Sequence, residues 1–62
     1  MTYQIRIVET ETGNELWNSP IASVGEALDF LRSHWLKEAE VGITWTVTDR
    51  DLGLVAASGM TI

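Results

Sequence analysis

The sequence contains no cysteine and only one histidine. Without cysteine the chain has no disulfide, no thiolate nucleophile, and no zinc or iron–sulfur site built on sulfur ligands. The single histidine, His34, is not accompanied by an identifiable nucleophile motif. On a helix it would lie one turn from Phe30 and Glu38, which favours a histidine on the flank of the helix over a general base. We therefore predict that the protein is not an enzyme and binds no metal ion or cofactor.

Positively charged residues and long hydrophobic runs are also scarce. Four Lys and Arg stand against nine Asp and Glu, which gives a net charge of −5 and an isoelectric point of about 4.4. This negative charge repels phosphate backbones and anionic lipids, so direct binding of nucleic acid or of a membrane is not expected. No apolar run approaches the roughly 18 residues of a membrane span, and the N-terminus lacks a signal-peptide pattern. We expect a soluble, cytoplasmic protein.

The length of 62 residues leaves room for little more than one core. A chain of this size buries only about 60% of the surface that its unfolded form exposes. We therefore predict that residues 1–62 form a single small globular domain without the deep, enclosed pocket that most enzymes use.

The first half of the sequence predicts a β-hairpin. From Tyr3 to Thr10 apolar and polar residues alternate, which is typical of a half-buried strand. Residues 11–14 predict a short turn with Gly13 in a left-handed conformation, so that Thr10 lies opposite Asn14. We expect the second strand to end at residues 18–20, because proline cannot donate a hydrogen bond to a sheet.

Counting outward from this turn predicts which side chains share a face of the hairpin. Ile7 then lies opposite Trp17, and Val8 lies opposite Leu16. The face expected in the core consists of Tyr3, Ile5, Ile7 and Trp17. The opposite face consists of Arg6, Val8, Leu16 and Asn18.

A helix is predicted next. Ser23 and Glu26 match the capping box, in which each side chain satisfies a free amide at the helix start. The helix is expected to run over about residues 24–37, since apolar residues recur at the spacing of one helical face. That face consists of Val24, Ala27, Leu28, Leu31 and Trp35.

The second half of the sequence predicts another hairpin. Over residues 43–48 every odd position is large and apolar and every even position is Thr, which indicates a strand with one buried face. Residues 49–53 begin like a calcium loop, but Gly53 arrives one residue early and the closing Glu is missing, so we interpret them as a hairpin turn. Residues 54–58 form the returning strand. No internal repeat is expected.

These elements predict an α+β fold with the order ββαββ. The alternating pattern favours a fully antiparallel four-stranded sheet with one helix packed on its apolar face. If the hairpins join by their outer strands, the first and last strands lie parallel at the centre.

The element order, the opening residues 1–3, Phe30 in the helix, and Trp45 followed by Thr in the third strand resemble the immunoglobulin-binding domain of streptococcal protein G. The resemblance implies a protein G-like architecture. It does not carry over antibody binding, because the lysine-rich character of that family's contact surface is missing here. The nearest positions in this chain are Asp29, Arg32, Ser33, Leu36 and Trp45.

Apolar side chains outside the expected core predict where a partner binds. Val8 and Leu16 would be neighbours on the face away from the helix, which suggests a patch for a partner or for a second copy of the chain. Arg6 extends that face. Trp17 lies near a presumed edge, where its ring would be half exposed, and Trp is enriched at binding hot spots. The predicted partner-binding residues are thus Arg6, Val8, Leu16 and Trp17.

The first hypothesis for function is a non-catalytic protein-binding module, such as a small adaptor or inhibitor. It would act through the open sheet face or an edge strand, and its acidic surface would steer it toward a basic protein partner. The second hypothesis is an acidic nucleic-acid mimic that blocks a cationic DNA- or RNA-binding channel. A third is an engineered scaffold with a protein G-like architecture and no natural ligand.

Overall fold

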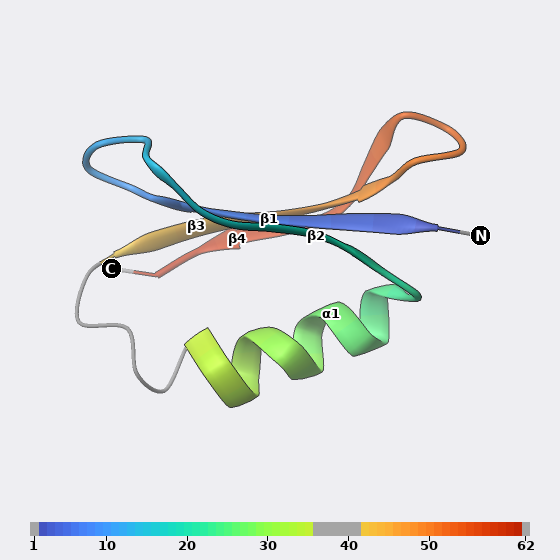
Figure 1. Ribbon diagram of the computed structural model, residues 1–62, viewed down its shortest axis with the longest axis horizontal. Coiled ribbons are helices and arrows are strands. Elements are labelled where there is room, and N and C mark those ends of the chain that lie inside the picture. The colour runs from blue at the N-terminus through green and yellow to red at the C-terminus, as the bar shows by residue number, and fades with distance from the viewer. Residues whose placement is uncertain (1, 36–41, 62) are drawn as a thin grey trace.

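The chain folds into one twisted sheet with a helix across one of its faces (Figure 1). The structure is a computed structural model, and it describes residues 2–35 and 42–61. The strands are β1 (Tyr3–Glu9), β2 (Glu15–Ile21), β3 (Ile43–Asp49) and β4 (Leu54–Met60). The helix α1 (Val24–Phe30) continues into a π-helical turn, η1 (Leu31–Trp35). The predicted α+β fold, with the order ββαββ and one helix on one face, is confirmed.

The strand order is β2-β1-β3-β4, and every neighbouring pair is antiparallel. The fully antiparallel sheet is therefore confirmed. The centre consists of β1 and β3, whereas β4 lies at an edge, so the first and last strands are not the parallel central pair considered above. No helix among the described residues has the length and apolar character that crossing a bilayer requires.

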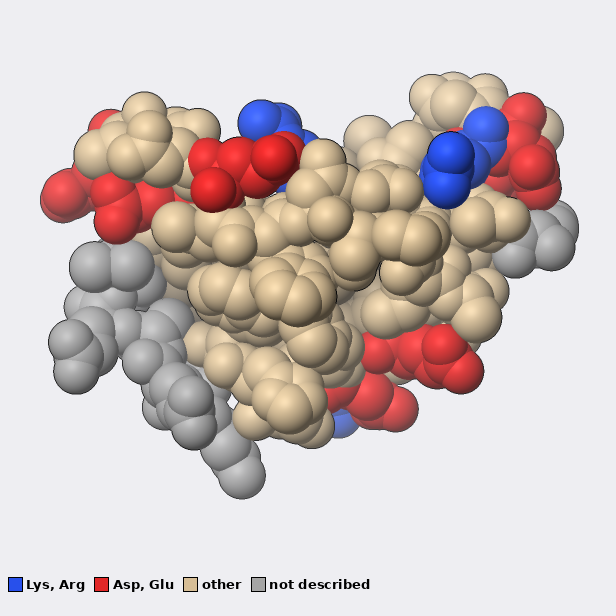
Figure 2. All heavy atoms as spheres, viewed as in Figure 1, with Lys and Arg blue, Asp and Glu red and all other residues tan. Residues whose placement is uncertain are grey.

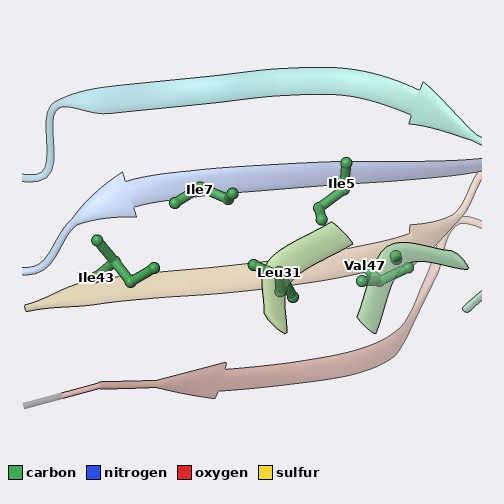
Figure 3. Close-up of a cluster of buried hydrophobic side chains, with 6 residues drawn as sticks. Ile5, Ile7, Leu31, Ile43 and Val47 are labelled. Carbon is green, nitrogen blue, oxygen red and sulfur yellow. The ribbon is translucent and has the colours of Figure 1, made fainter. Parts of the chain in front are cut away.

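The core lies between the central strands and the helix. Ile5 and Ile7 project from β1 toward Leu31, as Ile43 and Val47 do from β3 (Figure 3). With Ala27, these are the fully buried apolar side chains of the described residues. Removing them from water supplies the main favourable free energy of folding, since each large aliphatic side chain contributes about 1.5–3 kcal/mol when buried.

The helix begins where the capping residues predict. The Ser23 hydroxyl accepts a hydrogen bond from the Glu26 backbone N–H at 3.1 Å, and Val24 is the first helical residue. Ala27 and Leu31 of the predicted face are buried, and Val24, Leu28 and Trp35 pack against the same core. The predicted helix end at residue 37 lies outside the described residues.

The second strand does not end before Pro20. It runs to Ile21, and Pro20 lies opposite Gln4 in the ladder. The prediction was wrong because β2 is an edge strand, in which every second backbone N–H points to solvent. At such a position proline removes no hydrogen bond from the sheet.

The first hairpin contains one residue more than the prediction allowed. Glu9 donates its N–H to the Asn14 carbonyl at 2.8 Å, and Gly13 donates its own to the Glu9 carbonyl at 2.8 Å. Gly13 has φ 74°, which favours glycine. The turn therefore spans residues 10–13, and the predicted pairing of Thr10 with Asn14 was wrong.

A β-bulge in β2 absorbs the extra residue. Ile7 lies opposite Trp17, as predicted, but Val8 lies opposite Glu15. Leu16 is the bulged residue and has no partner in β1, so the predicted pair of Val8 with Leu16 is not formed. A bulge places two residues of one strand against one of its neighbour, which simple counting from the turn cannot anticipate.

The second hairpin repeats the first. Adding 40 to the residue numbers of the first hairpin gives the strand pairs of the second, including the bulge, which falls at Ala56. Gly53 has φ 70° and donates its N–H to the Asp49 carbonyl at 2.8 Å, as Gly13 does to Glu9. The repeat is one of backbone geometry and not of sequence, since under this offset Gly13 and Gly53 are the only identical pair in residues 3–21 and 43–61.

A pseudo-twofold axis relates the two hairpins. Under the same offset Arg6 corresponds to Thr46, and these residues lie opposite each other in the β1–β3 pair, so the axis passes between them. Figure 1 shows the consequence: the two hairpin tips lie at opposite ends of the sheet and both curve away from the helix.

The packing of Trp45 on Gly59 yields a prediction for stability. A Cβ atom at Gly59 would lie 2.5 Å from Cζ2 of the Trp45 ring. We expect Gly59→Ala to lower the free energy of unfolding by about 1–3 kcal/mol, because the rigid ring must move. Urea unfolding measures this loss. At Gly25 the nearest atom would be 3.9 Å away, so Gly25→Ala serves as the control and should not destabilise. Equal changes in the free energy of unfolding for Gly59→Ala and Gly25→Ala would contradict the close packing of Trp45 on Gly59.

Candidate functional site

Two exposed apolar side chains follow each other on edge strand β2. Leu16 occupies the bulge, and Trp17 is 42% exposed. A shallow hollow runs beside them along residues 15–19. The bulge therefore presents two adjacent apolar groups at the edge of the sheet.

Trp17 is held in place although it is exposed. Because it lies opposite Ile7, it belongs to the helix side of the sheet, where its ring meets Phe30 at 5.5 Å and Trp35 at 6.3 Å between centroids. Its indole N–H donates to the Ser19 hydroxyl at 2.9 Å. The ring therefore has a fixed orientation, while much of its surface faces solvent.

The neighbouring rings extend this surface. Phe30 and Trp35 are half-buried and pack against the core, and the exposed His34 ring lies 5.1 Å from Phe30. We call the four rings of Trp17, Phe30, His34 and Trp35 the aromatic platform. Its distances and tilts are those of favourable aromatic pairs. The platform joins edge strand β2 to the helix.

A polar network occupies the sheet face away from the helix, which we call the open face. Arg6 Nε donates to Glu15 Oε1 at 2.7 Å, and Asn18 Nδ2 donates to the same oxygen at 2.9 Å. Gln4 in turn donates to Asn18. The hydrogen bonds from Arg6 and then Asn18 hold the pKa of the Glu15 carboxyl below its ordinary value of 4.5.

The structure separates the predicted partner-binding residues. Arg6 and Val8 lie on the open face, where Arg6 is paired with Glu15. Trp17 lies on the helix side, and Leu16 occupies the bulge at the edge between the two faces. These four residues do not form one patch on the open face, whereas Leu16 and Trp17 remain adjacent.

That Phe30 and His34 extend the surface of Trp17 was not predicted from the sequence. Their spacing of four residues on the helix is a visible signal of contact between the two rings. Their contact with β2 carries no such signal, because it depends on how the helix crosses the sheet.

The other candidate positions have structural roles. The Asp49 carboxylate accepts hydrogen bonds from the backbone N–H groups of Asp51 and Leu52 at 2.9 and 3.2 Å, which confirms the predicted hairpin turn. Within residues 2–35 and 42–61, no group of three or more His, Asp or Glu is arranged to hold a metal ion. The residue expected beside His34, Glu38, lies outside the described part of the chain.

Acidic side chains border a broad uncharged surface. Figure 2 shows them at the hairpin tips and along the helix, on either side of an uncharged band. The acidic residues of the described part are Glu9, Glu11, Glu15, Glu26, Asp29, Asp49 and Asp51, of which Asp49 is buried. A partner that approaches this face meets an uncharged surface bordered by acidic side chains.

No protein-family model, no curated protein and no solved structure matches the chain.

The Glu15 network yields a prediction for pH dependence. Because folding lowers the pKa of Glu15, its charge contributes stability above pH 4.5, and this contribution is lost as the pH falls through the lower folded value. We expect Glu15→Gln to lower the melting temperature at neutral pH and the difference from wild type to vanish in acid. Glu11→Gln removes one charge from the same hairpin and is the control. A loss for Glu15→Gln that persists in acid would contradict an electrostatic origin.

Proposed function

We propose that the protein is a non-catalytic protein-binding module that engages its partner through edge strand β2. The contact surface consists of Leu16, Trp17 and the neighbouring rings of the aromatic platform. The supporting observation is that Trp17 is 42% exposed yet fixed by Phe30, Trp35 and Ser19. A large ring that is ordered before binding loses little conformational entropy when it is covered.

The chemistry of this surface favours a basic partner. The net charge of −5 accelerates the approach of a positively charged protein. A Lys or Arg side chain can then stack on the Trp17 ring, a contact of about 0.5–2 kcal/mol. The apolar side chain of Leu16 adds an uncharged contact beside it. The partner that fits is a protein surface with a basic residue next to an apolar one.

The experiment compares three forms of the protein as bait in a lysate of the cells that produce it. These are the wild type, Trp17→Ala and Val8→Ala. Proteins that the wild type and Val8→Ala retain but Trp17→Ala loses are identified, purified and titrated. We expect Trp17→Ala to weaken the affinity by about 1–3 kcal/mol. Val8→Ala alters the open face and should leave the affinity unchanged.

Salt distinguishes this function from nucleic-acid mimicry. A contact anchored by Trp17 and Leu16 should survive a rise from low to moderate salt, because apolar burial is not screened. A mimic of nucleic acid would lose its partner under the same change, and DNA would displace it. Full affinity of Trp17→Ala, or loss of the complex in moderate salt, would contradict the proposed function.

A further inference from the structure

The edge opposite to β2 carries no charge. From Leu52 to Ile62 the sequence contains no Asp, Glu, Lys, Arg or Pro, and this stretch includes all of β4. Exposed apolar side chains gather there. Leu52, Leu54, Val55 and Met60 are exposed by 61–70%, more than Leu16 or Trp17. An uncharged, apolar edge strand is a template for pairing with another strand.

The internal repeat shows that sequence, and not backbone geometry, distinguishes the two edges. Val55, Ser58 and Met60 of β4 occupy the positions that correspond to Glu15, Asn18 and Pro20 of β2. A charge, a hydrogen-bonded amide and a proline are typical of an edge that is protected from pairing. On β4 the three corresponding residues are all compatible with pairing.

The free backbone groups of β4 can be located from its ladder. Thr61 donates its N–H to the Ile43 carbonyl at 2.8 Å, so Thr61 and Gly59 direct their backbone groups toward β3. The alternating residues Met60 and Ser58 therefore direct N–H and C=O outward. Two β4 strands placed antiparallel about a twofold axis present identical sets of donors and acceptors to each other.

The lack of charge on β4 permits a second copy of the chain as the occupant. Two molecules of net charge −5 repel each other, so they can meet only where the charge density is low. The β4 strand is such a place. In an antiparallel pair the acidic tips at Asp51 lie at opposite ends, well apart from each other. An uncharged strand has no group with which to select a basic peptide.

We propose that β4 pairs antiparallel with β4 of a second copy and joins the two sheets into one continuous eight-stranded sheet. The contact uses the edge strand farthest from β2, so the aromatic platform stays free on both copies. Val55 and Met60 of each copy then lie against the other on the open face. Dimerisation and partner binding are thus independent properties.

The test is sedimentation equilibrium of wild type and two lysine variants over a wide concentration range. Ser58→Lys places a charge on the β4 edge, and Asn18→Lys places the same charge at the corresponding position of β2. Both variants lower the net repulsion between copies equally. We expect Ser58→Lys to raise the dimer dissociation constant by about tenfold or more, and Asn18→Lys to leave it unchanged or to lower it. Urea unfolding checks that both variants are folded.

Two measurements on the unmodified protein complete the test. Hydrogen exchange should slow at the Ser58 and Met60 amides as the concentration rises, and the dimer should strengthen with salt, because salt screens the repulsion between acidic copies. A protein that stays monomeric at all concentrations overturns the proposal. A dimer that Asn18→Lys weakens as much as Ser58→Lys does also overturns it. A dimer in which hydrogen exchange at the Ser58 and Met60 amides is not slowed has the same consequence.

Discussion

The antiparallel pairing of β1 with β3 is the interaction on which the rest of the structure depends. It joins the two hairpins and brings the apolar pairs of Ile5 with Val47 and Ile7 with Trp45 onto one face. Leu31 and Ala27 can bury their side chains only against this combined surface. Neither hairpin offers an adequate core by itself, since an isolated two-stranded sheet is marginal in water. The helix therefore packs on a surface that exists only after residues about 40 apart in sequence have paired.

A symmetric sheet beneath a single helix produces two different edges. The backbone of the two hairpins is equivalent, including the turn glycines and the bulges. On the β2 side, the space beside the helix is filled by Trp17 from the strand and by Phe30 and Trp35 from the helix. On the β4 side, the corresponding residue is Ala57, and the Trp45 ring extends from β3 to cover Gly59. Strand β4 contains no aromatic residue and so has no counterpart of the Trp17 ring on β2.

The sequence predicts those features that depend on local alternation and on helix capping. The burial of Ile5 and Ile7 on one face, the Thr stripe of β3 and the Ser23 cap follow from spacing alone, and the structure agrees. The predicted pairing of Ile7 with Trp17 is also present, because the bulge offsets the extra residue of the turn. The strand order could not be predicted from spacing. Joining the first strand to the third or to the fourth buries the same faces of the two hairpins. The contact of Trp17 with Phe30 and Trp35 could not be predicted from spacing either, since it depends on the angle between helix and sheet.

The errors have a common physical origin in the edges and turns. Counting from Gly13 assumed a regular ladder, whereas the left-handed glycine leads into a turn with one residue more, which the bulge at Leu16 absorbs. Pro20 was taken as a strand terminator, which holds for central strands and not for an edge. The repeat was not visible because a sheet constrains apolar alternation and turn chemistry far more than residue identity. Glu9 and Asp49 illustrate this: each accepts the N–H of a glycine four residues on, through a backbone carbonyl that any residue supplies.

The small core explains why the binding surface that we propose lies at an edge of the sheet and not in a pocket. Its buried side chains are all needed for folding, and a chain of this size has little surplus stability with which to maintain a deep pocket. At a sheet edge, in contrast, side chains already ordered by the fold are available to a partner without rearrangement. Trp17 suits the proposed function, because its contact with Phe30 and Trp35 stabilises the junction of helix and sheet while its outer surface remains exposed. The proposed contact also explains why Glu15 and Pro20 lie on the same strand. They discourage indiscriminate strand pairing at this edge, so that in the proposed function the side chains of Leu16 and Trp17 make the contact.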